Sequence, residues 1–360
     1  MTQRNTVLFI VLLAVSFNDG QAGELSGKPA FDSFRKIDIH AHFFADIPGL
    51  ADRLQTLRMD VINVCWSGKV PKEMQQMEAI AEEQFSKYGR VFQFASTFDL
   101  TNRNMLDYEQ KVIDWLDKSY AAGAVLTKIW KEIGMEFKTP TGDWLMPDDP
   151  LFDPIYTHMA NQGKPLLAHL GEPLAAWRPL DPKSPHYHYY RNNPEWHFFN
   201  KPGVAQWEDI IAARDRILEK HPGLTFIGAH MGSMAHDVNE VAQRLDRYNN
   251  FFVETAARIK DLMGQPKQKV RNFLIRYQDR VLYGTDFEWF PPEGIELSAE
   301  KLEAWLQRID RLHRLNYEYF AGSGMMDYNG QVVECLDLPV EVLKKFYYDN
   351  ARRIILDLAQ

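Results

Sequence analysis

Cysteine is scarce in this chain, because its 360 residues include only Cys65 and Cys335. Two cysteines exclude the disulfide framework on which small secreted scaffolds depend, so a hydrophobic core has to stabilise the fold. Cys65 follows an apolar run, which favours a small buried residue over a nucleophile. Whether the two thiols pair is left open by the sequence.

A concentrated basic segment is also missing. The net charge is −8, and the acidic and basic residues are spread along the chain. Nucleic-acid binding requires a concentrated positive surface that neutralises phosphates, so we expect no nucleic-acid partner. Apolar residues make up 45% and charged residues 25% of the chain, which are ordinary globular values that predict a large packed core.

The mostly apolar run from Val7 to Phe17 is too short to span a bilayer. Arg4 precedes it, and small residues follow it up to Ala22, which is the order of a cleavable signal peptide. We therefore expect residues 1–22 to be removed and residues 23–360 to form a single exported domain, periplasmic or secreted. Stable membrane insertion is not expected.

Short apolar runs alternate with longer amphipathic stretches through the rest of the chain. The runs with strand character are residues 36–42, 61–66, 91–97, 124–130, 165–171, 224–230, 251–255 and 280–286. Helical spacing occurs between them at residues 72–88, 105–121, 154–162, 208–220 and 236–248. Eight buried strands alternating with helices predict a parallel α/β sheet, and eight strands close a (β/α)8 TIM barrel. A doubly wound open sheet is the alternative, although no glycine-rich phosphate-binding fingerprint follows the first strand.

Two insertions interrupt this alternation. The segment from Gly171 to Gln206, after the fifth strand, is rich in Trp, Tyr, His and Pro, and loops of this length are usually functional. Its Arg178 and Arg191 are candidates for binding an acidic substrate, while a self-packed surface loop is the alternative. The second insertion, after the eighth strand, runs from Phe287 to Leu336 around a helix expected at residues 298–315.

Residues that can bind a metal end four of the predicted strands. His40 and His42 lie on one face at the end of the first strand, and His169, His230 and Asp286 end the fifth, sixth and eighth. Singly, each has an ordinary explanation, as a hydrogen-bonded structural histidine or as a helix N-cap. The carboxyl ends of barrel strands share one rim, however. Together these residues favour a site for a divalent ion that prefers nitrogen and carboxylate ligands.

The motifs "DIHAHFF", "LLAHLGEP", "FIGAHMGS" and "VLYGTDFEW", in that order, resemble those of the amidohydrolase superfamily. The closing "LPVEVLKKFYYDNARRIIL" is similar to the last helix of its amidohydrolase 2 branch, which includes the aminocarboxymuconate-semialdehyde decarboxylase group. The resemblance covers the chain from Lys36 to its end. It implies one divalent ion, first of all Zn²⁺ with Mn²⁺ or Fe²⁺ as alternatives, held by His40, His42, His169 and Asp286. It also implies that His230 and Asp286 are the catalytic residues that move protons, for which histidine has a suitable ordinary pKa.

Lys128 lies near the end of the fourth strand. The resemblance offers two roles for it, because binuclear members of the superfamily carry a carboxylated lysine there that bridges two metals. In that case Lys128 would carry a carbamate and a second ion would bind. Otherwise Lys128 would be a cation that binds the substrate. The sequence does not choose between them.

The resemblance implies a metal-dependent hydrolase, in which a metal-activated water attacks an ester, lactone or amide bond of a small acidic or cyclic substrate. Residues 1–22 add the expectation that this enzyme is exported. The alternative is a metal-dependent non-oxidative decarboxylase or hydratase on the same site. A non-enzymatic binding protein ranks third, because none of the five rim residues is missing. The expected partner is a small-molecule substrate, and association into a homo-oligomer is left open.

Overall fold

The computed structural model describes residues 25–66, 71–289 and 298–357. Within these ranges, nine parallel strands form one sheet in the order β8-β7-β6-β5-β4-β3-β2-β1-β9. The strands are β1 (Lys36–Phe43), β2 (Met59–Val64), β3 (Phe92–Ser96), β4 (Leu126–Ile129), β5 (Leu166–Ala168), β6 (Phe226–Gly228), β7 (Phe251–Glu254), β8 (Val281–Leu282) and β9 (Phe287–Trp289). Each of the eight predicted strands is present.

The sheet closes where its eighth strand meets its first. Just beyond β8, the carbonyl oxygen of Tyr283 accepts a hydrogen bond from the backbone N–H of Ile39 at 3.1 Å. The N–H of Asp286 then donates to the carbonyl oxygen of His40 at 2.7 Å, and β9 pairs with β1 in parallel. β8 thus lies within the predicted eighth strand, residues 280–286, and β9 follows it directly. The expected α/β architecture, a (β/α)8 barrel, is confirmed.

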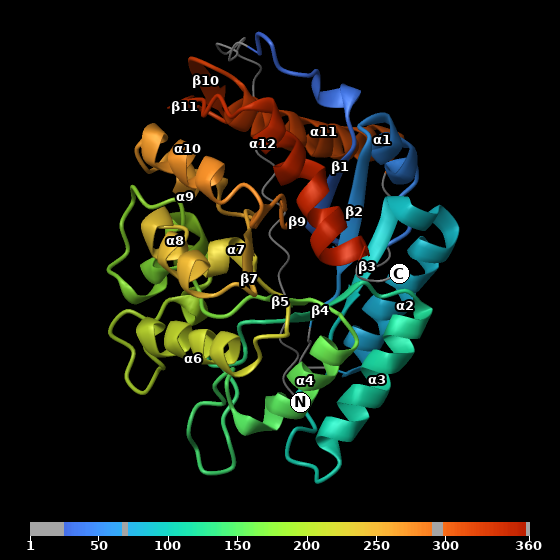
Figure 1. The fold of residues 1–360 in the computed structure, drawn as a ribbon, viewed down its shortest axis with the longest axis vertical. Helices are drawn as coiled ribbons and strands as arrows, with labels where there is room; N and C mark the ends of the chain where they lie inside the picture. The colour runs from blue at the N-terminus through green and yellow to red at the C-terminus, as the bar shows by residue number, and fades with distance from the viewer. Residues whose placement is uncertain (1–24, 67–70, 290–297, 358–360) are drawn as a thin grey trace.

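Helices surround the strands (Figure 1). They are α1 (Leu50–Thr56), α2 (Pro71–Tyr88), α3 (Tyr108–Ala122), α4 (Asp153–Asn161), α5 (Tyr187–Asn192), α6 (Trp207–Lys220), α7 (Ala229–Gly232), α8 (Val238–Arg247), α9 (Ile259–Met263), α10 (Lys267–Arg276), α11 (Ala299–Ala321) and α12 (Val340–Lys344), which continues in π-helical turns to Leu356. The five predicted helices correspond to α2, α3, α4, α6 and α8. Helices α1, α5, α7, α9 and α10 were not predicted.

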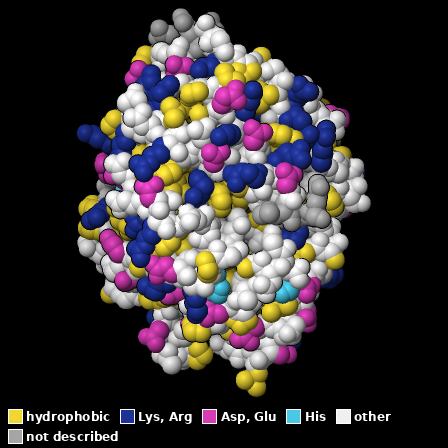
Figure 2. Space-filling view, viewed as in Figure 1, with side chains coloured by type: hydrophobic (Ala, Val, Ile, Leu, Met, Phe, Trp, Pro, Cys, Tyr) yellow, Lys and Arg dark blue, Asp and Glu magenta, His cyan; other side chains and the backbone are white. Residues whose placement is uncertain are grey.

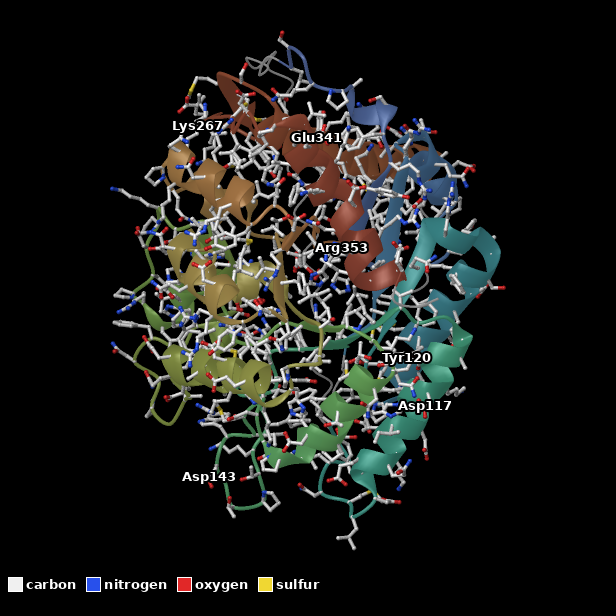
Figure 3. All side chains as sticks on the ribbon, in the orientation of Figure 1. Asp117, Tyr120, Asp143, Lys267, Glu341 and Arg353 are labelled. Carbon is white, nitrogen blue, oxygen red and sulfur yellow. The ribbon has the colours of Figure 1, made fainter. Side chains whose placement is uncertain are left out.

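Local signals in the sequence explain where several helices begin and end. The Asp237 side chain caps α8 by accepting the N–H of Asn239 at 2.7 Å. α3 ends at Gly123, whose φ of 113° favours glycine. Neighbouring helices are then tied together by side chains, as where His158 of α4 donates to Asp117 of α3 at 2.7 Å (Figure 3).

The hydrophobic core fills the space between strands and helices. A smaller cluster joins Ile37 and Ile39 of β1 to Ile354 and Ile355 of the C-terminal helix, which explains why that helix closes the fold. Cys65 is buried, as expected of a small core residue, and both it and Cys335 are free thiols. On the face seen in Figure 2, basic and acidic side chains are interspersed.

The two insertions contain secondary structure of their own. The first contains α5 between helical turns at Leu174–Trp177 and Pro194–Trp196, and it packs on itself where the Trp177 and Phe198 rings stack 5.3 Å apart. The second contains α11, longer than expected, and a hairpin of β10 (Met325–Tyr328) and β11 (Gln331–Glu334) that was not predicted. Part of it, residues 290–297, and the expected signal peptide, residues 1–22, lie outside the described residues. None of the described helices combines the length and hydropathy that crossing a membrane requires.

Candidate metal centre and active site

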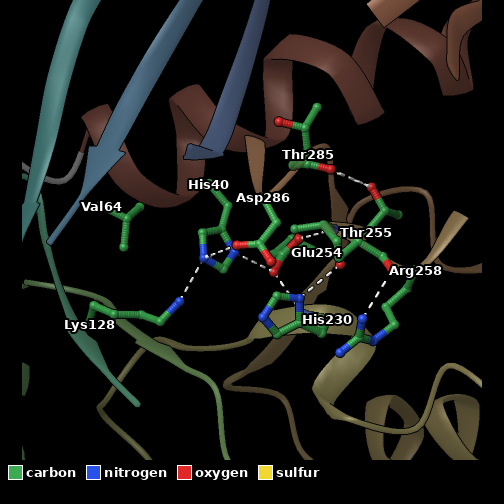
Figure 4. Close-up of polar contacts among 12 residues, drawn as sticks. His40, Val64, Lys128, His230, Glu254, Thr255, Arg258, Thr285 and Asp286 are labelled. Atoms are coloured by element: carbon green, nitrogen blue, oxygen red, sulfur yellow. Dashed lines mark hydrogen bonds and ion pairs between the residues drawn. The ribbon is translucent and has the colours of Figure 1, made fainter. Parts of the chain in front are cut away.

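Two histidines of β1 and the aspartate beyond β8 meet at the mouth of the barrel. Figure 4 shows His40 and Asp286 side by side there. The Nε2 atoms of His40 and His42 lie 3.3 and 3.2 Å from the same Oδ1 atom of Asp286. Asp38 holds these segments together, because its Oδ1 accepts the backbone N–H groups of both His40 and Thr285, at 3.0 and 3.1 Å. Residues at opposite ends of the chain are thereby brought within reach of one ion.

The tautomers of three histidines are set by what their Nδ1 atoms contact. The Nδ1–H of His40 donates to Glu254 Oε1 at 3.0 Å, that of His42 to the carbonyl oxygen of Val64 at 2.6 Å, and that of His230 to the carbonyl oxygen of Ala256 at 2.9 Å. Each Nε2 therefore carries a lone pair. This pattern is typical of metal-binding histidines, whose second nitrogen donates to a carboxylate or a carbonyl group.

His169 and His230 stand on the other side of the same mouth. The His230 ring centroid lies 4.2 Å from that of His169 and 5.0 Å from that of His40. The ligand atoms of His40, His42 and Asp286 all lie within 4.8 Å of one another, and a second such group is His40, His230 and Glu254. His169 belongs to neither group. Its Nε2 is buried and has no hydrogen-bond partner among the described residues, so it is free to bind a ligand.

The backbone is strained where two of these side chains leave their strands. His230 has φ 57° and ψ 45°, and Asp286 has φ 60°, in the left-handed region that most residues avoid. The His230 N–H compensates by donating to Glu254 Oε1 at 2.7 Å. Strain of this kind costs about 1–3 kcal/mol per residue and persists where the surrounding structure holds it, often at functional sites.

Glu254, at the end of β7, was missed by the sequence analysis. It is fully buried, and its two oxygens accept the His40 Nδ1–H and the backbone N–H groups of His230 and Ala256. Gly284 allows it this position, because a Cβ atom at Gly284 would lie 2.8 Å from Glu254 Oε2. Since these contacts occupy it, we interpret Glu254 as a residue that orients His40. A carboxylate ending the seventh apolar run was the available signal.

Lys128, the last residue but one of β4, points into the cluster. Its Nζ lies 2.7 Å from His40 Nε2, and its side chain is buried (Figure 4). Burial lowers the pKa of Lys128 to about 8, although the nearby carboxylates of Asp286 and Glu254 oppose that shift. Lys128 therefore contacts one of the predicted metal ligands.

Burial and the close approach of these groups set the electrostatics of the site. Burial alone raises the pKa of Asp286, but the imidazoles of His40 and His230 outweigh it and hold that pKa well below its usual range. Burial lowers the pKa of His230 to about 3, although Asp286 opposes the shift. His230 is thus neutral near pH 7, whereas the sequence suggested an ordinary histidine pKa.

A second shell of charged residues lies around the mouth. Lys131 and Glu172 form a buried ion pair, and the Lys131 Nζ lies 3.8 Å from the centre of the Trp196 ring, which ties the first insertion to the barrel. Arg178 and Arg191 are exposed on that insertion. Arg178 lines a cavity of about 270 Å³ in it, and among the described residues the contacts of the histidine cluster include neither guanidinium group.

The residues present fit a divalent metal ion. Three histidine Nε2 atoms and one carboxylate oxygen are the donor set that zinc and related ions take. The orphaned Nε2 of His169 is the observation that tests this fit, because a buried imidazole nitrogen without a partner is rare unless a ligand or water occupies it.

Comparison with known proteins bears on the family and the fold of the chain. The model of the amidohydrolase family Amidohydro_2 matches residues 37–355. The solved structure of 2,6-dihydroxybenzoate decarboxylase from Rhizobium is 14% identical, with 89% of this chain and 98% of that chain covered and a TM-score of 0.52. That of 4-oxalomesaconate hydratase from Rhodopseudomonas palustris is 14% identical, with 90% and 97% covered and a TM-score of 0.48. No curated protein matches the sequence significantly.

The family match spans both halves of the barrel, including all four motifs that carry the histidines and the aspartate. The likeness to the decarboxylase structure agrees with the fold derived from the strands and their closure. The chain therefore belongs to the Amidohydro_2 family of amidohydrolases and is a metal-dependent enzyme of that family.

Proposed function

We propose that the protein is a metal-dependent hydrolase that cleaves an ester, lactone or amide bond of a small molecule. The observation that carries the proposal is the convergence of histidine Nε2 lone pairs on Asp286 beside the unpartnered Nε2 of His169. His40, His42, His169 and Asp286 would hold one ion, with Zn²⁺ favoured by the donor set. Such an ion, when bound, lowers the pKa of water and polarises a carbonyl group.

The protein's own residues supply proton transfer and orientation. His230 keeps its Nδ1–H on the carbonyl oxygen of Ala256, so its neutral Nε2 is the atom that accepts a proton from the attacking water. Asp286 remains ionised and is the second group that can take a proton. Glu254 keeps the His40 ring in place throughout, because it contacts no atom that reacts.

Elemental analysis combined with an activity screen tests this proposal. We expect about one equivalent of a divalent metal per chain and hydrolysis of at least one class among esters, lactones and amides. Treatment with a chelator should abolish that activity, and added Zn²⁺ or Mn²⁺ should restore it. A metal-free protein that still hydrolyses the substrate would refute the proposal.

A non-oxidative decarboxylase or hydratase is the second candidate. The buried cations Lys128, Lys131 and Arg258 around the mouth favour it, because such reactions act on acidic substrates. The 2,6-dihydroxybenzoate decarboxylase from Rhizobium carries out decarboxylation on a similar fold. Release of carbon dioxide from an aromatic acid, without hydrolysis of any ester, lactone or amide, would support this candidate over the first.

The state of Lys128 decides between one metal and two. A carbamate on Lys128 would add carbon dioxide to the mass of the native protein and would be lost on acidification. A second equivalent of metal should accompany it. If the native mass shows no such addition, Lys128 is a free amine beside His40.

We also propose that the chain is exported. Residues 1–22 support this proposal, because they have the pattern of a signal peptide. Arg4 precedes the apolar run, and the small residue Ala22 follows it. The mature protein should then begin at Gly23. Mass spectrometry of the protein purified from its native cells would measure this, and an intact N terminus would contradict export by cleavage.

A further inference from the structure

Arg258 is a buried cation next to the histidine cluster. It follows β7 directly before α9, and it is 8% exposed. Figure 4 shows its guanidinium group beside His230, on the side away from Lys128. A charged group in such a place normally faces an opposite charge, because an unpaired buried charge is costly.

The described residues do not supply that opposite charge. The Nη1 of Arg258 donates to the carbonyl oxygen of Ala257 at 3.0 Å, while its Nε is buried without a hydrogen-bond partner. Among the described residues, no carboxylate forms an ion pair with it. Arginine carries five N–H donors in a planar fork, so most of its hydrogen-bonding capacity remains unused.

Two carboxylates of the site are already engaged by other groups. Glu254 accepts the His40 Nδ1–H and the His230 N–H. Glu172 forms an ion pair with Lys131 and accepts the Tyr190 hydroxyl at 3.0 Å. Neither is available to Arg258.

The other cations of the site differ from Arg258 in this respect. Lys131 has Glu172 as its anionic partner. Lys128 lies against His40 Nε2, at the centre of the cluster rather than at its edge.

We propose that Arg258 binds a carboxylate group of the substrate, so that the enzyme acts on small organic acids. A carboxylate matches the planar fork of a guanidinium group and can accept two parallel hydrogen bonds from it. Its charge would also balance the unpaired cation. The inference rests on the proposed function, since it takes the histidine cluster as the reaction centre. It assigns substrate binding to the barrel mouth rather than to Arg178 and Arg191.

Binding of carboxylates to the zinc-loaded protein tests the proposal. Benzoate and succinate serve as probes, and benzamide is the neutral control. Isothermal titration calorimetry would compare the wild type with Arg258→Met and with Arg178→Met, which removes an exposed arginine outside the cluster. We expect the wild type to bind at least one of the two acids more tightly than benzamide. Arg258→Met should weaken that binding by about tenfold or more, and Arg178→Met should leave it unchanged.

Three results would overturn the proposal: equal affinity of wild type and Arg258→Met for the acid, a loss in Arg178→Met as large as in Arg258→Met, or no saturable binding of either acid to the wild type. If Arg258→Met does not fold, as judged by its melting transition, Arg258→Lys replaces it. That variant keeps the charge but lacks the planar fork, so we expect about a fivefold or larger loss of affinity. Unchanged affinity in Arg258→Lys would count against bidentate binding and so against the proposal.

The same samples separate this proposal from the proposed function. Zinc content is measured on each variant, and acid binding is also measured on the zinc-free wild type and on zinc-free Arg258→Met. Failure of the wild-type protein to bind zinc would contradict the proposed function. If zinc-free wild type binds the acid more tightly than zinc-free Arg258→Met, the role of Arg258 is still supported. If wild type and Arg258→Met bind the acid equally, both with and without zinc, the role of Arg258 is refuted and the proposed function is unaffected.

Discussion

At the scale of single residues, the orientation of His40 depends on Glu254. The carboxylate fixes the Nδ1–H of the ring, and the same oxygen holds the strained backbone of His230. One buried group thus positions both the proposed metal ligand His40 and the proposed proton acceptor His230. Groups of this kind are retained because the ligand they orient would otherwise rotate or change its tautomer.

Substituting Glu254 should therefore weaken metal binding. We expect Glu254→Gln to lower zinc affinity by about 10–100-fold, because a carboxamide orients the imidazole less strongly than a carboxylate. Competition with a chromogenic chelator would measure the affinity. The control is Glu341→Gln, which alters an exposed glutamate on α12, labelled in Figure 3, and should bind zinc as the wild type does. Equal affinities in the two variants would refute the orienting role.

Removal of the His230 ring should separate metal binding from catalysis. We expect His230→Ala to remain folded and metal-loaded and to lose about 10²–10⁴-fold in turnover, because general acid–base catalysis contributes that much. Metal content and steady-state rates would be measured together. His188→Ala, which changes an exposed histidine of the first insertion, should keep its activity. Full turnover in His230→Ala would show that another group moves the proton.

At the scale of elements, a buried glutamate joins two helices to a strand. Glu78 of α2 accepts hydrogen bonds from Ser96 at the end of β3, at 2.8 and 2.9 Å, and from Ser119 of α3. Burial raises the pKa of Glu78 from its usual 4.5 to about 7, although both serine hydroxyls oppose the shift. The folded protein therefore keeps a proton on this group over a range in which the unfolded chain has lost it.

This raised pKa predicts the direction of a pH effect on stability. Below pH 4.5 both states are protonated, and as the pH rises to about 7 the unfolded state loses its proton first, so Glu78 destabilises the fold increasingly. The free energy of unfolding should contain a loss of at most about 3 kcal/mol from this group between pH 5 and pH 8. Urea titrations should show a smaller loss over that interval in Glu78→Gln than in the wild type. An identical loss in both proteins would assign the effect to other groups.

Elements of the fold were predictable to different degrees. All eight barrel strands were found from their apolar runs, but the hydrogen-bonded part is shorter, as in β5, which covers Leu166–Ala168 within the expected 165–171. An apolar run in the sequence indicates which residues are buried. The strand itself ends where the backbone of the neighbouring strand no longer forms hydrogen bonds with it. The hairpin β10–β11 was missed because its exposed Val332 and Met325 do not give an alternating pattern.

At the scale of the whole molecule, the site connects strands that are far apart in the chain. The first, fifth, sixth and eighth strands each contribute one or two side chains to it. An ion bound there would bind the folded chain and not the unfolded one. Its binding free energy would then add to the stability of the entire barrel.

Metal removal should consequently destabilise the fold. We expect the protein stripped with a chelator to melt at a lower temperature than the zinc-loaded protein, because a ligand at a hundred times its Kd stabilises by about 2.7 kcal/mol. Differential scanning calorimetry with and without added Zn²⁺ would measure the shift, and Mg²⁺, which prefers oxygen ligands, is the matched control. Identical melting of stripped and zinc-loaded protein would mean that no ion binds at this site.

The amino-acid sequence by itself determined the barrel, the family and the positions of five candidate site residues, because burial periodicity and the polar residues that end each strand are local features. Only the tertiary structure decided which groups surround them. His40 and Glu254 are 214 residues apart in the chain, and Arg258 becomes a candidate only because its surroundings leave it without a carboxylate. Such contacts depend on how the closed sheet places one strand end against another, and no local pattern records that.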